Sequence, residues 1–221
     1  MLLAVAATEI EMAPLRHLSA GQEVGWMTLA GGVGPVETAL RLTRFLCTER
    51  HNITGIVNFG VAGAYFQPEG MQQADLLDIC LAEREILGDF GICMPEGMTY
   101  LPEDLAGRVD FQLDHGMRGR AALTLQEHGI PVISGTFITV NAVSGSRLRG
   151  EELRRRWQGL CENMEGAAIG RVCAAFNLPL MEIRCISNKV EDRNPQNWRL
   201  AEACEKAARA AFLLLRELTQ A

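Results

Sequence analysis

The sequence predicts an α/β fold: a single domain over residues 1–221, with helices covering a largely parallel or mixed β-sheet. Short apolar runs alternate with stretches of helical periodicity along the whole chain, as they do in strand–helix units. No linker-like segment and no internal repeat interrupts this alternation. A hydrophobic content of 48% with 22% charged residues is typical of a well-buried globular protein.

Three strands are predicted in the N-terminal part. Residues 2–6 form a continuous apolar run, which fits a strand buried on both faces, and Thr8 is placed to cap a helix with Pro14 near its start. Residues 24–30 and 53–59 are the next two strands, and each is followed by a loop of small residues, 31–34 and 60–64. Such loops either allow helices to pack closely or bring backbone N–H groups to an anion, a sugar or a flat ligand.

The same alternation continues to the C-terminus. Strands are predicted at 75–83, 130–139 and 178–187, helices at 118–128 and 150–158, and a final helix capped by Asn197 that runs to Leu218. Residues 88–116 are rich in Gly, Pro and Met and lack periodicity. They predict a long irregular segment, and segments of this kind are often functional.

Residues 162–168, Glu-Asn-Met-Glu-Gly-Ala-Ala, are the most informative turn in the chain. Small residues and a helical pattern follow directly, so Glu165 is expected at a strand-to-helix junction, where backbone N–H groups stabilise an anion. Two interpretations are open at this point. Glu165 either caps its helix or belongs to a functional site.

Composition excludes several classes of function. A formal net charge of −6 argues against nucleic-acid or anionic-membrane partners, which bind clustered Lys and Arg. Seven cysteines without a CxxC motif indicate reduced thiols and a cytoplasmic location. The histidines show no metal-ligand spacing, so neither a metal nor another cofactor is expected.

The motifs at the predicted strand ends, taken in order, resemble the nucleoside phosphorylase/hydrolase superfamily, especially the methylthioadenosine/S-adenosylhomocysteine nucleosidases. They are Ala-Thr-Glu-Ile-Glu at 7–11, Gly-Val-Gly at 32–34, Asn-Phe-Gly-Val-Ala-Gly at 58–63, Met-Glu-Gly-Ala-Ala at 164–168 and Arg-Cys-Ile-Ser-Asn at 184–188. Within the superfamily the chain most resembles the futalosine hydrolases of menaquinone biosynthesis, on residues 136–141 and 186–198. The resemblance implies a three-layer domain with a mixed, twisted sheet, and at least a homodimer.

The resemblance also implies roles for individual residues. Glu11 falls at the water-activating position, with Glu9 as its near competitor, and Glu165 falls at the ribose-binding glutamate. Met164 would pack under the ribose and Phe137 would stack on the purine, although either could be an ordinary core residue. The other expected substrate contacts lie in the two small-residue loops: Gly32, Gly60 and Val61.

Asn188 departs from the methylthioadenosine-type pattern, which has an aspartate at this position. An amide can donate to a 6-oxo group while it accepts from a protonated N7, whereas an ionised carboxylate only accepts. Asn188 therefore favours a hypoxanthine-type leaving base, the base of futalosine. Futalosine also carries a benzoate, for which Arg193, Lys189 and Arg184 are candidate partners.

Three functions remain open from the sequence. The first is a futalosine hydrolase, which would act without a metal on a small purine nucleoside. The second is another purine nucleosidase or a phosphorylase, whose phosphate site would need arginines such as Arg41, Arg44 or Arg84. The third is a non-catalytic nucleoside-binding protein, which would have no need of a water-activating acid.

Overall fold

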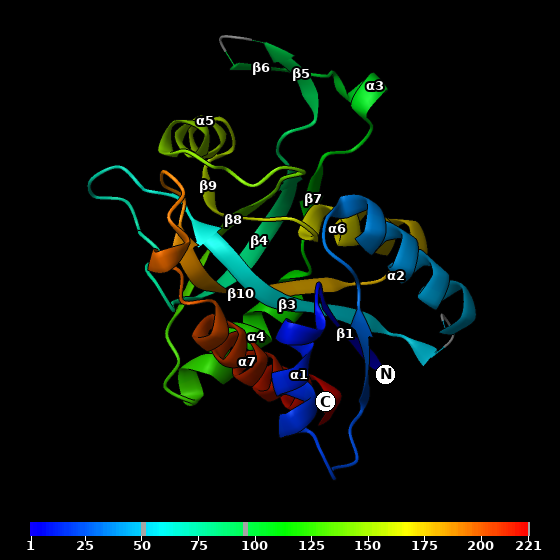
Figure 1. Ribbon diagram of the computed structural model, residues 1–221. Helices are drawn as coiled ribbons and strands as arrows, with labels where there is room; N and C mark the ends of the chain where they lie inside the picture. The colour runs from blue at the N-terminus through cyan, green and yellow to red at the C-terminus, as the bar shows by residue number, and fades with distance from the viewer. Residues whose placement is uncertain (50–51, 95–96, 221) are drawn as a thin grey trace.

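The computed structural model describes residues 1–49, 52–94 and 97–220, and its centre is a mixed β-sheet (Figure 1). The strands follow the order β10-β4-β8-β9-β3-β1-β2, with β7 beside β4. Because β10 also pairs with β3, five of the strands, β3, β10, β4, β8 and β9, close into a ring. The strand bounds are β1 (Leu2–Ala6), β2 (Trp26–Ala30), β3 (Gly55–Ala64), β4 (Ile79–Leu87), β7 (Asp110–Gln112), β8 (Val132–Thr139), β9 (Gly159–Asn163) and β10 (Leu180–Lys189).

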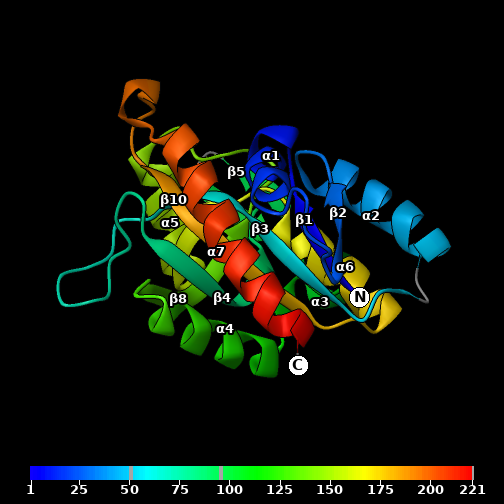
Figure 2. The same cartoon turned by 90° about the horizontal axis from the view of Figure 1, so that it is seen from below.

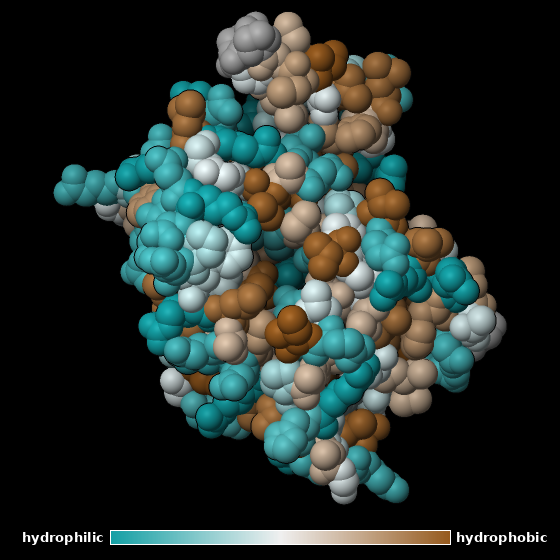
Figure 3. Space-filling view, viewed as in Figure 1, coloured by the Kyte–Doolittle hydropathy of each residue, from teal (hydrophilic) through white to brown (hydrophobic). Residues whose placement is uncertain are grey.

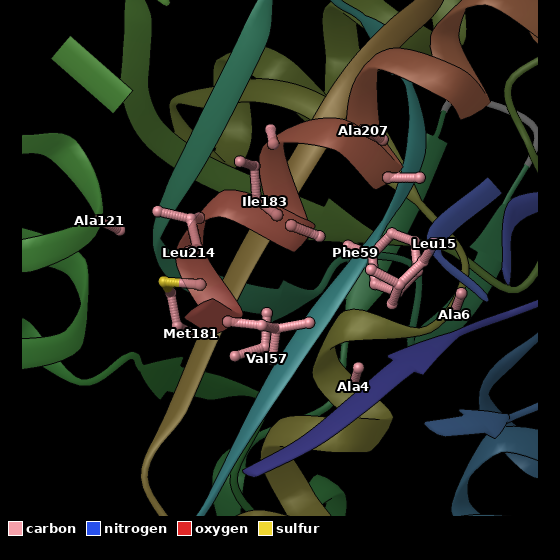
Figure 4. Close-up of a cluster of buried hydrophobic side chains, with 14 of the residues drawn as sticks. Ala4, Ala6, Leu15, Val57, Phe59, Ala121, Met181, Ile183, Ala207 and Leu214 are labelled. Atoms are coloured by element: carbon pink, nitrogen blue, oxygen red, sulfur yellow. The ribbon is translucent and has the colours of Figure 1, made fainter. Parts of the chain in front are cut away.

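Helices cover both faces of the sheet, which gives three layers (Figures 1 and 2). On one face lie α1 (Glu9–Leu18), α4 (His115–Glu127) and α7 (Leu200–Gln220), and on the other lie α2 (Pro35–Glu49) and α6 (Gly166–Phe176). Figure 4 shows part of the core between the sheet and the helices α1, α4 and α7, to which Val57 and Phe59 of β3 and Leu214 of α7 belong. Full burial of side chains of this size stabilises the fold by roughly 1.5–3 kcal/mol each.

The segment 88–116 is more regular than its composition predicts, which corrects that expectation. It contains the hairpin β5 (Gly91–Met94) and β6 (Gly97–Tyr100), the short helix α3 (Glu103–Ala106), strand β7 and the start of α4; residues 95 and 96 lie outside the described residues. The hairpin and α3 project away from the sheet (Figure 1). α5 (Arg147–Trp157) packs near the base of this projection, over Tyr65 and Ile138.

Two other predictions about elements were wrong. Residues 60–64 continue β3 instead of forming a loop, because β10 and β9 pair with them on either side. Asn197 ends a 3₁₀ turn (Pro195–Asn197) and its amide donates to Glu191, whereas α7 begins three residues later at Leu200. In the part of the chain that the structure describes, no helix has the length and apolar character needed to cross a membrane.

Candidate active site

A cavity of about 250 Å³ opens at the carboxyl ends of β1, β3, β9 and β10. This edge is where α/β sheets place their ligands. Five residues predicted from the sequence line the cavity: Glu11, Val61, Met164, Glu165 and Asn188. They come from four separate stretches of chain, which the fold brings together at one cavity.

Glu11 is a buried carboxylate held by the start of its own helix. Its Oε2 accepts from the backbone N–H and the hydroxyl of Thr8, at 3.0 and 2.9 Å, and the Thr8 hydroxyl accepts from the Glu11 N–H. This is a capping box, in which the helix start and the carboxylate fix each other. The other oxygen, Oε1, accepts from the Val61 N–H at 3.1 Å.

Glu9, two residues earlier, points elsewhere. Its side chain is 63% exposed and pairs with Arg16 at 2.6 Å. It does not line the cavity, whereas Glu11 does and is only 6% exposed. The geometry therefore favours Glu11 over Glu9 as the cavity's acid from this helix.

Glu165 occupies the N-cap position of α6, but its side chain caps nothing. Its Oε1 accepts from the Gly34 N–H at 3.2 Å and its Oε2 from Arg184 at 3.3 Å. The helix is capped by Asn163, whose Oδ1 accepts from the N–H groups of Glu165 and Gly166 at 2.9 and 2.8 Å. Burial raises the pKa of the Glu165 carboxyl, while Arg184 and the Gly34 N–H act in the opposite direction.

Arg184 stands at the back of the cavity and is 1% exposed. Its Nε donates to Glu182 Oε1 at 2.8 Å, and its Nη1 donates to the Val61 carbonyl at 3.2 Å. Burial acts to lower the pKa of this guanidinium, but the surrounding carboxylates of Glu182, Glu165 and Glu11 raise it overall. Arg184 is therefore a fixed charge among acids, and is not available as the benzoate partner that the sequence allowed.

Gly60 of β3 lies against Glu11 and Arg184 but does not line the cavity. A Cβ at this position would lie 2.5 Å from Glu11 Oε1 and 2.9 Å from Arg184 Nη1. A side chain at position 60 would thus collide with both groups. The absence of a Cβ leaves the carboxylate and the guanidinium facing a common point.

A bulge in β10 turns Asn188 into the cavity. Ile186 pairs with Ala62 and Asn188 with Gly63, so Ser187 is the extra residue. The Ser187 hydroxyl donates to Asn188 Oδ1 at 2.9 Å, and Asn188 Nδ2 donates to the Lys189 carbonyl at 3.1 Å. One N–H of the amide is left to donate to a ligand.

Two predicted contacts need correction. Phe137 is fully buried in the core between the sheet and α6, and it does not line the cavity. Its place on β8 points it inward, so it cannot stack on a ligand there. Gly32 adopts φ +89° and its carbonyl accepts from Thr38, so it shapes the turn while the next residue, Val33, reaches the cavity.

The two remaining candidates for the benzoate partner, Lys189 and Arg193, differ in whether a carboxylate already pairs with them. Lys189 pairs with Asp75 at 2.6 Å. The Arg193 guanidinium lies over the Trp198 ring, 4.7 Å from its centroid, and no carboxylate among the described residues pairs with it. Arg193 does not line the cavity itself, but Trp198 does.

Sequence reasoning missed several residues of the site. Leu200 and Cys204 reach the cavity from the start of α7, and Trp198 reaches it from the segment just before that helix. Burial raises the pKa of the Cys204 thiol to about 11, so at neutral pH this thiol lines the cavity as an uncharged group. Glu162 also lines the cavity, held by the Ser144 and Tyr65 hydroxyls at 2.7 and 3.0 Å. The acidic turn was a signal for Glu162, but no local pattern marks the start of α7.

Within residues 1–49, 52–94 and 97–220, no set of three or more His, Cys, Asp or Glu side chains is arranged to hold a metal ion. The polar side chains that line the cavity include carboxylates, amides, hydroxyls and one guanidinium. Such groups can move a proton, anchor hydroxyls and donate hydrogen bonds to a leaving group.

Comparison with known proteins places the chain among enzymes of one superfamily. The sequence profile of the phosphorylase superfamily matches residues 16–220. A futalosine hydrolase of Thermus thermophilus is 35% identical over 87% of this chain and 82% of that protein. A 5'-methylthioadenosine/S-adenosylhomocysteine nucleosidase of Mycobacterium tuberculosis is 26% identical over 86% of this chain and 80% of that protein.

The fold is also that of solved structures, as predicted. A futalosine hydrolase mutant of Helicobacter pylori superposes with a TM-score of 0.82 at 17% identity, over 96% of this chain and 97% of that one. This likeness confirms the α/β architecture, and the sequence matches give the closer relationship. The chain belongs to the phosphorylase superfamily and, within it, to the family of the futalosine hydrolases.

Proposed function

We propose that this protein hydrolyses the N-glycosidic bond of futalosine and releases hypoxanthine and dehypoxanthine futalosine, in menaquinone biosynthesis. The observation that carries the proposal is the meeting of Glu11, Glu165 and Asn188 in one cavity. Those three groups supply a base for water, an anchor for the sugar and a partner for the leaving base. Membership of the futalosine hydrolase family supports the choice of substrate.

Glu11 is the proposed general base. Water attacks C1′ of the ribose, the C1′–N9 bond breaks, and its electron pair leaves with the purine, through a sugar with oxocarbenium character. Glu11 takes the proton of the attacking water. Glu11 lines the cavity itself, which places its carboxylate beside the space that the ribose and the attacking water would share.

Glu165 and Met164 are the proposed ribose contacts. A carboxylate accepts hydrogen bonds from the 2′- and 3′-hydroxyls together, and it stabilises positive charge that develops on the sugar. Arg184 and the Gly34 N–H fix the two oxygens of Glu165, so the carboxylate is preorganised before the substrate arrives. Met164 is half-buried beside it and offers an apolar surface to the sugar ring.

Asn188 is the proposed partner of the base. Its free amide N–H donates to O6 of hypoxanthine, and its Oδ1 accepts from a protonated N7 once the amide gives up the Ser187 hydroxyl. Because an amide is a very weak acid, Asn188 stabilises the leaving group by hydrogen bonding and does not transfer a proton to it.

Hydrolysis is favoured over phosphorolysis by the distribution of cations. Among the described residues that line the cavity, Arg184 is the only cation, and buried carboxylates already surround it. Arg41 pairs with Glu37 and Arg84 with Asp110, both outside the cavity, and Arg44 does not line it. A phosphate would face Glu11 and Glu165 with no unpaired positive charge to hold it.

Arg193 is the proposed partner of the benzoate. It lies on the cavity's rim through its contact with Trp198 and has no competing carboxylate among the described residues. An exposed ion pair contributes about 1 kcal/mol at most, so Arg193→Ala should raise KM roughly fivefold for futalosine and leave KM for inosine unchanged. Equal changes for both substrates would remove Arg193 from the site.

We also propose a homodimer or higher homo-oligomer, acting in the cytoplasm. Hydrophobic residues surround the hollow on the face seen in Figure 3. Two exposed hydrophobic residues line the cavity, Ile10 and Val33, at 67% and 54% exposure, and two more lie on α2, which begins just after Val33: Val36 and Leu40, at 80% and 52%. Exposed apolar surface of this kind marks protein–protein contacts. Sedimentation should give a dimer or larger, and Val36→Glu should weaken it.

The proposed reaction is tested by one assay of free base. The protein is incubated with futalosine, inosine, methylthioadenosine and S-adenosylhomocysteine, with and without phosphate. We expect hypoxanthine from futalosine at a rate that phosphate does not change. Dependence on phosphate would indicate a phosphorylase, faster release of adenine would indicate the other nucleosidases, and no release would indicate a binding protein.

A further inference from the structure

A second layer of charged groups lies behind the cavity, inside the ring of strands. Glu182 of β10 and Glu85 of β4 are both 0% exposed, and neither lines the cavity. Glu182 contacts Arg184 directly, with Nε donating to Oε1 at 2.8 Å. Glu85 contacts Asn163 and Thr139, the two residues that cap α6. These buried acids have no part in the reaction as described above.

We propose that Glu182 is a positioning residue: its ionised carboxylate orients the Arg184 guanidinium toward the cavity, while Glu85, across Gly166, keeps its proton. The inference rests on the proposed hydrolysis for its kinetic tests, and on the contacts of the two acids for everything else.

The contacts assign the charge to Glu182. An arginine stays protonated in proteins, and the nearest carboxylate in a buried pair carries the opposite charge. Glu85 has neutral donors only: the Thr139 hydroxyl at 2.8 Å on Oε2 and the Asn163 amide on Oε1. Burial, and then the charge of Glu182, raise the pKa of Glu85 well above its usual range.

Gly166 brings the two acids together. A Cβ at this position would lie 2.1 Å from Glu85 Oε1 and 2.5 Å from Glu182 Oε2, so both oxygens press against the glycine. Glu182 Oε2 is buried and has no hydrogen-bond donor among the described residues. A proton on Glu85 removes the repulsion between the two carboxyl groups.

Orientation matters because a guanidinium is a planar, rigid fork. With Nε held by Glu182, Nη1 is directed at the Val61 carbonyl and Nη2 at Glu165. If the anchor is weakened, Arg184 can turn about its own axis and lose its alignment with Glu11 and Glu165. A misplacement of about 1 Å in such a group costs roughly 100-fold in rate.

The first test compares two matched variants, Glu182→Gln and Glu85→Gln, on whichever purine nucleoside the wild-type protein cleaves best. Glutamine resembles a protonated carboxyl, so we expect Glu85→Gln to change kcat less than about threefold. Glu182→Gln should lower kcat roughly 10- to 100-fold with little change in KM, because Glu182 does not touch the cavity. Equal losses, or a larger loss in Glu85→Gln, would overturn the proposal.

A second test asks whether Glu182 acts through Arg184. In an Arg184→Lys background the guanidinium fork is gone, and adding Glu182→Gln should cause little further loss of kcat. Additive losses would show that Glu182 acts by another route. Thermal unfolding of each variant checks that the fold is retained.

A structural role alone would not move the pH profile. Loss of the Glu182 charge lowers the pKa of Glu165, so the acid limb of kcat/KM should shift to lower pH in Glu182→Gln. An unmoved limb would contradict the assignment of charge to Glu182. The titratable and charged groups that face Glu182 from the elements around it are Glu85, Cys161, Glu165, Cys173 and Arg184.

The protonation of Glu85 has a readout that needs no activity. The infrared spectrum at neutral pH should contain the C=O stretch of a buried protonated carboxyl, and Glu85→Gln should remove it. Persistence of the full band in Glu85→Gln would overturn the assignment. If the wild type cleaves no nucleoside, the proposed function fails, and the infrared result alone decides whether Glu85 holds the proton.

Discussion

Two helices begin at the rim of the cavity, and they place their carboxylates in different ways. At the start of α1, Thr8 caps the helix and Glu11 bonds back to Thr8, all within four residues. At the start of α6, Glu165 stands at the cap position but bonds to Gly34 and Arg184, far away in the chain. The first carboxylate is positioned by local sequence and the second by the assembled fold.

The difference has a physical reason. A capping box satisfies its helix and fixes its acid at once, so Glu11 needs little from the rest of the protein. The Glu165 side chain does not need to cap α6, because Asn163 and Thr139 accept the hydrogen bonds of the backbone N–H groups in the first turn. It follows that changes near α1 should act mainly on the reaction, and changes near α6 on the fold as well.

The largest expected effect is on catalysis, at α1. Glu11→Gln should lower kcat by roughly 10²- to 10⁴-fold, because an amide cannot take the proton of water. The matched control is Glu9→Gln, two residues away, exposed and paired with Arg16, which should leave kcat unchanged. If Glu9→Gln proved the inactive variant, the assignment of the base would have to be reversed.

At α6 the next effect should appear as a loss of stability. Gly166→Ala puts a Cβ against Glu85 and Glu182 and should destabilise the fold by about 3 kcal/mol, seen as a lower midpoint in urea unfolding. Gly119→Ala in α4 is the control, since no atom lies within 4 Å of a Cβ there. That variant should stabilise by about 0.5–1 kcal/mol. Similar midpoints for the two would mean that Gly166 is not crowded.

The smallest expected effect is the loss of unfolding free energy when either helix cap, Thr8 of α1 or Asn163 of α6, is replaced. Thr8→Ala removes one local cap and should cost about 1 kcal/mol of unfolding free energy. Asn163→Ala removes the acceptor of two backbone N–H groups and a donor to buried Glu85, and should cost about 2 kcal/mol or more. Equal costs in chemical denaturation would show that α6 depends on its distant partners no more than α1 does.

The sequence predicts the features that depend on neighbouring residues and misses those that depend on distant partners. The apolar runs, the helix cap at Thr8 and the helix after Gly166 are all local patterns, and the structure confirms these elements. Local sequence predicts a loop at residues 60–64 because the strands that pair with them lie more than 90 residues later. Small residues there reflect the close approach of Glu11 and Asn188 side chains, not a turn.

The site shows the same limit. Glu11, Glu165 and Asn188 sit in recognisable motifs, and the structure places all three at one cavity. The sequence does not reveal that Phe137 points into the core, because the face that a strand residue takes depends on its pairing, and the partner strand β9 carries an extra residue, Leu160, opposite Thr136 and Phe137. The bulge at Ser187 and the acids behind Arg184 depend on pairing across the ring, which no local pattern reveals.

The most direct test of the substrate assignment compares two substrates that differ at one position of the base. Futalosine has a 6-oxo group and aminofutalosine a 6-amino group, with the same sugar and benzoate. If Asn188 donates to O6, kcat/KM for futalosine should exceed that for aminofutalosine by roughly 10- to 100-fold. A ratio of one, or a preference for aminofutalosine, would contradict the role given to Asn188 and the function built on it.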